Sequence, residues 1–121
     1  MSEINAKLSQ AETLKDEEKF DEAIALLLEI LEEDPQHAIC HFTLAVLYGK
    51  VDQHDKAVEH GETAVALDPN DPFSYTAMSV TYQRAYADTD DHSFIAKAED
   101  AMEKSRLVAQ QQHTPGQGPS C

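Results

Sequence analysis

The feature that most limits the fold of this chain is an acid–proline pair that returns at a fixed interval. Asp34-Pro35 closes one apolar stretch and Asp68-Pro69 closes another, 34 residues later. Residues at the same interval also match in size inside these stretches: Ala23 with Ala57, Ile24 with Val58, Leu14 with Tyr48, and Tyr48 with Tyr82. A constant period with matched side-chain sizes indicates one structural unit used several times.

The unit consists of helices, because apolar residues recur at a spacing of three and four positions. Asp34 is expected to cap the N-terminus of the third helix, with Pro35 in its first turn. A polar segment, DTDDH at 88–92, is expected to form a loop. The pattern predicts no strand and six helices, at about 4–15, 21–33, 38–51, 55–67, 73–87 and 94–110.

The net charge of the chain limits the classes of partner that it is expected to bind. Nine basic residues against 23 acidic ones give a formal net charge of −14. A nucleic-acid partner is not expected, because binding phosphates requires a basic face. No apolar run reaches the ~20 residues that cross a bilayer, so membrane insertion is not expected either. The N-terminus lacks the pattern of a signal peptide, and Cys40 and Cys121 form no disulfide framework, so a cytoplasmic location is expected.

The repeat resembles that of the tetratricopeptide repeat family, a helix pair of 34 residues. His41, Leu44-Ala45 and Tyr48 stand at the positions of the family's first helix, and Ala57, Ala64 and Asp68-Pro69 at those of its second helix. The resemblance implies an all-α, right-handed solenoid of about three antiparallel helix pairs. The predicted domain covers residues 1–112, with units at about 4–35, 36–69 and 70–110, and residues 113–121 are expected to be a disordered tail.

The sequence departs from the family pattern in two places. Gly61 stands where the second helix of the repeat has a bulky residue. The third unit carries about seven extra residues between its two helices, including the acidic segment at 88–92, and these are expected to lengthen the loop.

In this family the first helices of successive units line a concave groove that holds peptide or protein segments. The positions at which the best-known subclass clamps a carboxylate carry Leu8, Glu12, Thr43, Phe73 and Ala77 here, so that clamp is not expected. Without the clamp, the groove that the resemblance implies is an apolar strip bordered by three cationic side chains. The predicted groove residues are Ile39, Phe42, Thr43, Val46, Lys50, Phe73, Ala77, Val80, Arg84 and Lys15.

Two sequence patterns partly match those of metal sites. His37, Cys40 and His41 include a pair of histidines one helical turn apart, but no fourth ligand follows in sequence. Asp88, Asp90, His92, Ile95 and Glu99 match part of a calcium loop, although Ser93 replaces its glycine. Structural roles explain both better, and we expect no metal, no cofactor and no catalytic residue.

Two functions remain open at this stage. The first is a non-enzymatic scaffold or adaptor that binds a peptide or protein segment in the groove, with Lys15, Lys50 and Arg84 holding an acidic flank. The second is self-association through the same apolar strip.

Overall fold

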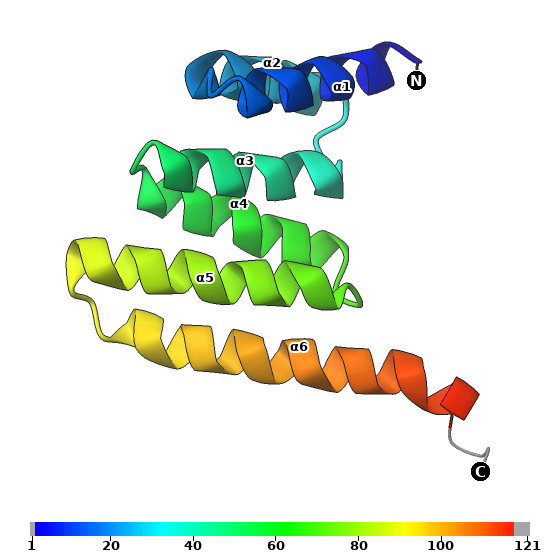
Figure 1. Ribbon diagram of the computed structural model, residues 1–121, viewed down its shortest axis with the longest axis vertical. Coiled ribbons are helices and arrows are strands. Elements are labelled where there is room, and N and C mark those ends of the chain that lie inside the picture. Colours follow the sequence, from blue (N-terminus) through cyan, green and yellow to red (C-terminus); the bar gives the residue numbers. More distant parts are fainter. Residues whose placement is uncertain (1, 118–121) are drawn as a thin grey trace.

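The computed structural model describes residues 2–117, and within this range it contains six helices and no strand. None of the described helices is both long and apolar enough to cross a membrane. The predicted all-α architecture is confirmed. The helices are α1 (Ser2–Asp16), α2 (Phe20–Glu33), α3 (Ala38–Lys50), α4 (His54–Leu67), α5 (Pro72–Thr89) and α6 (Ser93–Gln117) (Figure 1).

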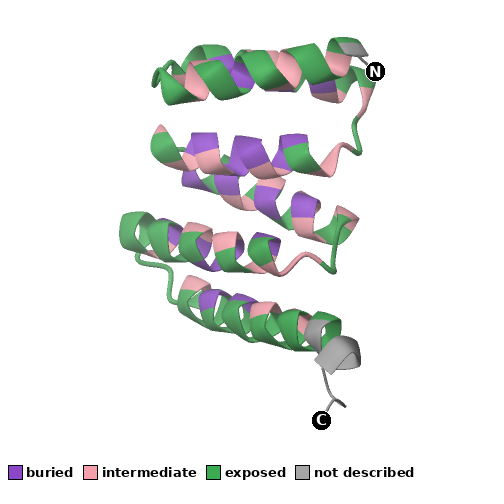
Figure 2. Ribbon diagram, turned by 45° about the vertical axis from the view of Figure 1, so that its right-hand side comes forward, coloured by how far each residue is buried: buried purple, intermediate pink, exposed green. Residues whose placement is uncertain are grey.

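Consecutive helices form three antiparallel pairs that stack from the N-terminus to the C-terminus (Figure 1). The first helices of the second and third pairs, α3 and α5, run in the same direction and lie next to each other. Helix α3 is apolar on almost every side and is buried between its neighbours, as expected of a helix without a polar face (Figure 2). The two helices predicted to line the groove in the second and third units, α3 and α5, are therefore parallel.

The turn inside each pair has the same backbone geometry. Glu18, Asp52 and Asp90 each adopt a left-handed conformation with φ of 63°. Asp, as at positions 52 and 90, tolerates this conformation better than most residues with a Cβ atom, because its short polar side chain can hydrogen-bond locally. Glu18 and Asp52 are 34 residues apart, whereas Asp52 and Asp90 are 38 apart, so the third unit is longer by four residues.

These extra residues were predicted to lengthen a loop, and that prediction was wrong. Ala87, Asp88 and Thr89 belong to α5, and only residues 90–92 connect it to α6. Four residues are close to one helical turn of 3.6, so α5 gains a turn while its buried face stays in phase. The Asp91 carboxylate then accepts a hydrogen bond from the backbone N–H of Ser93 at 3.0 Å, which lowers the pKa of Asp91.

The predicted role of Asp34 also needs correction. Asp34 is the C-cap of α2, and its N–H bonds to the Ile30 carbonyl. Helix α3 begins three residues after Pro35, at Ala38, with His37 as its N-cap: His37 Nδ1 accepts from the Cys40 N–H at 3.2 Å. A turn at Pro35 and Gln36 separates the helices, because the residue before a proline disfavours helical geometry.

The hydrophobic core has two parts. The larger part spans the first two units and contains fully buried Leu27, Ile30, Leu44 and Leu47. The smaller part lies in the third unit, where Met78, Tyr82, Ala98 and Ala101 pack together with Val58, Val65 and Phe94. Burial of these side chains supplies most of the driving force for folding.

That residues 113–121 form a disordered tail stays a prediction. Helix α6 continues to Gln117, because the good helix formers from Ala109 to Gln112 extend it past the core. Residues 118–121 lie outside the described part of the chain. Near this end the Gln112 side chain donates to the Asn70 carbonyl, which joins α6 to the turn before α5.

Candidate interaction groove

The two parallel helices α3 and α5 enclose a cavity of about 240 Å³ on the groove face. Six of the predicted groove residues line it. Phe42, Val46 and Lys50 come from α3, spaced by one helical turn, and Ala77, Val80 and Arg84 come from α5. This volume is below the range of about 300–1,000 Å³ that is typical of small-molecule sites. It is large enough for a single side chain.

The floor of the cavity was not predicted from sequence. It is formed by Ala45, Gly61 and Met78, which bring together α3, α4 and α5. A Cβ atom on Gly61 would lie far inside contact distance of the Met78 sulfur, so only glycine permits this packing. The sequence did contain a signal, namely glycine in place of the bulky residue of the repeat, but that signal does not reveal which side chain fills the space.

Lys50 and Arg84 lie at one end of this cavity and also line a second one of about 570 Å³. Lys50 Nζ is 5.9 Å from the centre of the Phe20 ring, and the Arg84 guanidinium lies against Gly49. Within the described residues neither cation forms an ion pair. Both are exposed, so they are available to an incoming anion.

His54, at the start of α4, lines both cavities and was not predicted as a site residue. Its side chain is buried, with 8% exposed. Nε2 lies 3.7 Å from the Asp52 carboxylate, whereas Nδ1 is buried and has no hydrogen-bond partner among the described residues. Buried polar atoms are usually paired, so an unpaired one calls for an explanation.

The other predicted groove residues occupy different surroundings. Ile39 and Phe73, near the beginnings of α3 and α5, are 63% and 78% exposed. Thr43 is buried and donates to the Ile39 carbonyl at 2.9 Å, so its side chain faces its own helix. Lys15 forms an ion pair with Glu12 on α1 at 3.0 Å and is not among the residues that line the cavity. The structure therefore gathers two of the three predicted cations.

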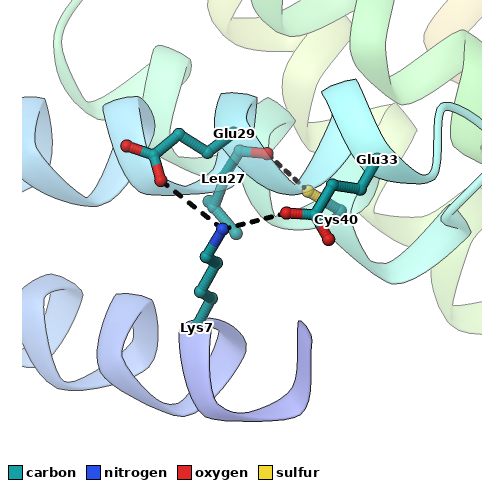
Figure 3. Close-up of polar contacts among 5 residues, drawn as sticks. All are labelled: Lys7, Leu27, Glu29, Glu33 and Cys40. Atoms are coloured by element: carbon teal, nitrogen blue, oxygen red, sulfur yellow. Dashed lines mark hydrogen bonds and ion pairs between the residues drawn. The ribbon is translucent and has the colours of Figure 1, made fainter. Parts of the chain in front are cut away.

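The three residues of the possible zinc pattern face different partners. His37 caps α3, and Cys40 Sγ donates to the Leu27 carbonyl at 3.2 Å, where α2 and α3 pack (Figure 3). Burial, with a smaller effect of Asp34, raises the pKa of the Cys40 thiol to about 12. His41 donates from Nε2 to the Pro35 carbonyl at 2.9 Å. Across the described residues no three histidine, cysteine or acidic side chains gather as metal ligands.

A further cavity of about 420 Å³ lies among α4, α5 and α6. The Tyr82 hydroxyl on its wall donates to the Glu62 carboxylate at 2.7 Å. Burial, together with this hydrogen bond, raises the pKa of Tyr82. Lys97 Nζ covers the Tyr82 and Phe94 rings at 5.9 and 5.6 Å from their centres. The hydrogen bond joins α5 to α4, and the Lys97 contact with Tyr82 joins α6 to α5.

Comparisons with solved structures show the same fold. A crystal structure of MamA matches with a TM-score of 0.79 at 16% identity, covering 92% of this chain and 61% of that one. The CopN–Scc3 complex matches with a TM-score of 0.77 at 16% identity, covering 91% and 61%. The second TPR of Spaghetti (RPAP3), bound to the HSP90 peptide SRMEEVD, matches with a TM-score of 0.74 at 16% identity, covering 87% and 91%.

This chain thus spans about three-fifths of the MamA chain that it matches. A search of curated proteins found no match. The tetratricopeptide repeat family profile matches residues 14–79, which hold the second unit and parts of its neighbours. Taken with the period, the stacked helix pairs and the structural neighbours, this match shows that the chain belongs to the tetratricopeptide repeat family.

Proposed function

We propose that this protein is a non-enzymatic interaction module, a scaffold or adaptor, that binds a peptide or protein segment in the groove between α3 and α5. The observation that carries the proposal is the cavity between these helices, which has apolar walls from Phe42, Val46 and Val80 and stands open on the surface. Ile39 and Phe73, near the starts of the same helices, are exposed apolar side chains. A groove of this kind accepts an extended or helical segment.

The charges suggest the character of the segment. In a chain of net charge −14, Lys50 and Arg84 are two cations without an acidic partner among the described residues, and both lie at one end of the groove. An acidic flank on the bound segment would satisfy them. The domain of Spaghetti, a structural neighbour, holds an acidic peptide, and CopN–Scc3 is a protein complex, which supports a peptide or protein partner here.

The test replaces Phe42 and Phe73 with glutamate and measures capture of partners from a lysate. We expect the double variant to lose the partner, because charge in the groove excludes its apolar side chains. The matched control changes Met102 and Leu107 to glutamate, since these exposed apolar residues lie on α6. Circular dichroism should report the same helicity for all three proteins. Capture that persists in the groove variant and fails in the control would refute the proposal.

Self-association through the same groove is the second candidate. It is favoured by the high exposure of Ile39 and Phe73, at 63% and 78%, because apolar surface of this kind is stabilised when covered. Light scattering across a concentration series decides between the two functions. A larger species that dissociates in the Phe42→Glu, Phe73→Glu variant supports self-association, whereas a monomer at high concentration excludes it.

A further inference from the structure

The end of the groove near Lys50 has the features of an anion site. Two cations from different helices, Lys50 and Arg84, line the same two cavities as the buried His54 ring. Helix α4 begins at His54, and its N-cap Gln53 makes no side-chain hydrogen bond to the first turn. Free N–H groups at the start of a helix attract negative charge.

His54 provides the independent evidence for a ligand. Its ring is more than nine-tenths buried and lines the cavities, yet Nδ1 has no partner among the described residues. Leaving such a group unpaired costs about 1–3 kcal/mol. Because Nε2 faces the Asp52 carboxylate, Nδ1 donates when both ring nitrogens carry a hydrogen, and a ligand carboxylate oxygen is an acceptor for that N–H.

Several acidic side chains lie at the same end of the groove as Lys50, His54 and Arg84. Glu18, Asp52 and Asp88 line the outer cavity, and Asp55 lies in the first turn of α4. Of these, only Asp52 approaches one of the three basic side chains within ion-pair distance, at His54 Nε2 and 3.7 Å. The local acids thus leave Lys50, Arg84 and His54 Nδ1 without a bonded partner.

The spacing along the groove relates this anion site to the apolar cavity. Val46 and Val80 precede Lys50 and Arg84 by four residues, which is about 6 Å along each helix. In an extended segment, side chains at positions i and i+2 point to the same side and are about 7 Å apart. An apolar residue and an acidic residue two positions apart therefore match the groove.

We propose that, in the segment bound under the function proposed above, an Asp or Glu carboxylate binds among Lys50, His54 and Arg84. The apolar side chain two residues away enters the cavity floored by Gly61. This site differs from the family's carboxylate clamp, whose positions carry Leu8, Glu12, Thr43, Phe73 and Ala77 here. The partner is thus recognised through an apolar–x–acid pattern.

The test uses three blocked synthetic peptides that differ in one feature: Ac-GSLSEGS-amide, Ac-GSLSQGS-amide, and Ac-GSLSGSEGS-amide with wider spacing. Binding is followed by ¹H–¹⁵N spectra of the protein, which report both affinity and location. At low salt we expect the first peptide to bind about threefold to tenfold more tightly than either of the others, as for a few partly exposed charge pairs. The His54 Nδ1 resonance should shift with the first peptide and not with the glutamine peptide.

The variant Lys50→Gln, Arg84→Gln should reduce this preference to about one. Its matched control is Lys56→Gln, Lys97→Gln, which changes the net charge equally at cations that contact aromatic rings elsewhere. Equal binding of all three peptides in the groove would overturn the carboxylate site and leave the proposed function intact. If no peptide perturbs the groove at millimolar concentration, the inference also falls, while loss of lysate capture in the Phe42→Glu, Phe73→Glu variant would still support the function.

Discussion

Gly61 on α4 shapes both the core and the groove by lacking a side chain. The Met78 side chain occupies the space in which a Cβ atom of residue 61 would lie, and Ala45 borders the same space from α3. The result is a cavity floor made by three helices. The presence of Gly61 instead of a bulky residue therefore determines which side chains form the floor of the cavity.

The substitution Gly61→Ala should lower the free energy of unfolding by about 1 kcal/mol in urea denaturation. Moving Met78 costs about 1–3 kcal/mol, and the better helix propensity of alanine returns about 1 kcal/mol. In a Met78→Ala background the same change should become stabilising, because the collision is gone. A Gly61→Ala effect of the same sign in both backgrounds would show that Met78 is not the cause.

Helices α3 and α4 are joined by a pair of histidines. His41 donates from Nε2 to the Pro35 carbonyl, so neutral His41 has Nδ1 free to accept. The facing Nδ1 of His60, 3.0 Å away, must then carry the hydrogen. Tyr48 stacks on His60 with ring centres 5.5 Å apart, and Lys56 covers Tyr48. With both rings fully protonated, two N–H groups would face each other, so this contact depends on protonation.

This contact predicts that stability falls as the pH drops below the ordinary histidine pKa of about 6.5. Burial lowers the pKa of His60, as do His41 and Lys56, while Glu59 opposes them. Below pH ~6.5 the unfolded chain therefore binds a proton that folded His60 does not, and the stabilisation is lost down to the lowered pKa. The midpoints of urea denaturation between pH 7.5 and pH 5.5 measure this loss of stability. His60→Gln should flatten the dependence, whereas His92→Gln, at an exposed position, should leave it unchanged.

The whole molecule has two core clusters and an end helix that is packed on one side. The first two units share ten buried core residues, five per unit, and the core cluster of the third unit has four. Helix α6 packs on α5 along one face and exposes Ile95, Met102 and Leu107 on others. In repeat proteins stability is close to a sum over units and their interfaces, so the two ends need not unfold together.

Native-state hydrogen exchange should therefore show lower opening free energies for amides of α6 than for those of α2 and α3. The variant Ala98→Gly removes a buried methyl group and lowers helix propensity, so it should speed exchange in α6 by about tenfold or more. Exchange in α2 should change much less. If α2 and α6 respond equally, the chain opens as a single cooperative unit and the prediction is wrong.

The sequence alone predicted the features that depend on local periodicity. The 34-residue interval predicted the helix pairs, and Ala23 and Ala57, which it matches in size, are both fully buried. These predictions succeed because burying one face of each helix requires apolar residues at regular intervals in the sequence. The prediction of a helix cap from Asp34 was wrong. Asp34 caps the end of α2 instead of the start of α3, because the residue before a proline disfavours helical geometry.

Tertiary structure decided the features that depend on side chains from several helices. Lys15 lies 35 residues before Lys50, one more than the 34 between Lys50 and Arg84. It pairs with Glu12, whereas the other two cations share a cavity. Met78 and His54 are 17 and 7 residues from Gly61, and they meet at the groove only because α4 packs against α5. Periodicity records which face of a helix is buried, but the volume left between three helices depends on the fit of particular side chains, which no local pattern encodes.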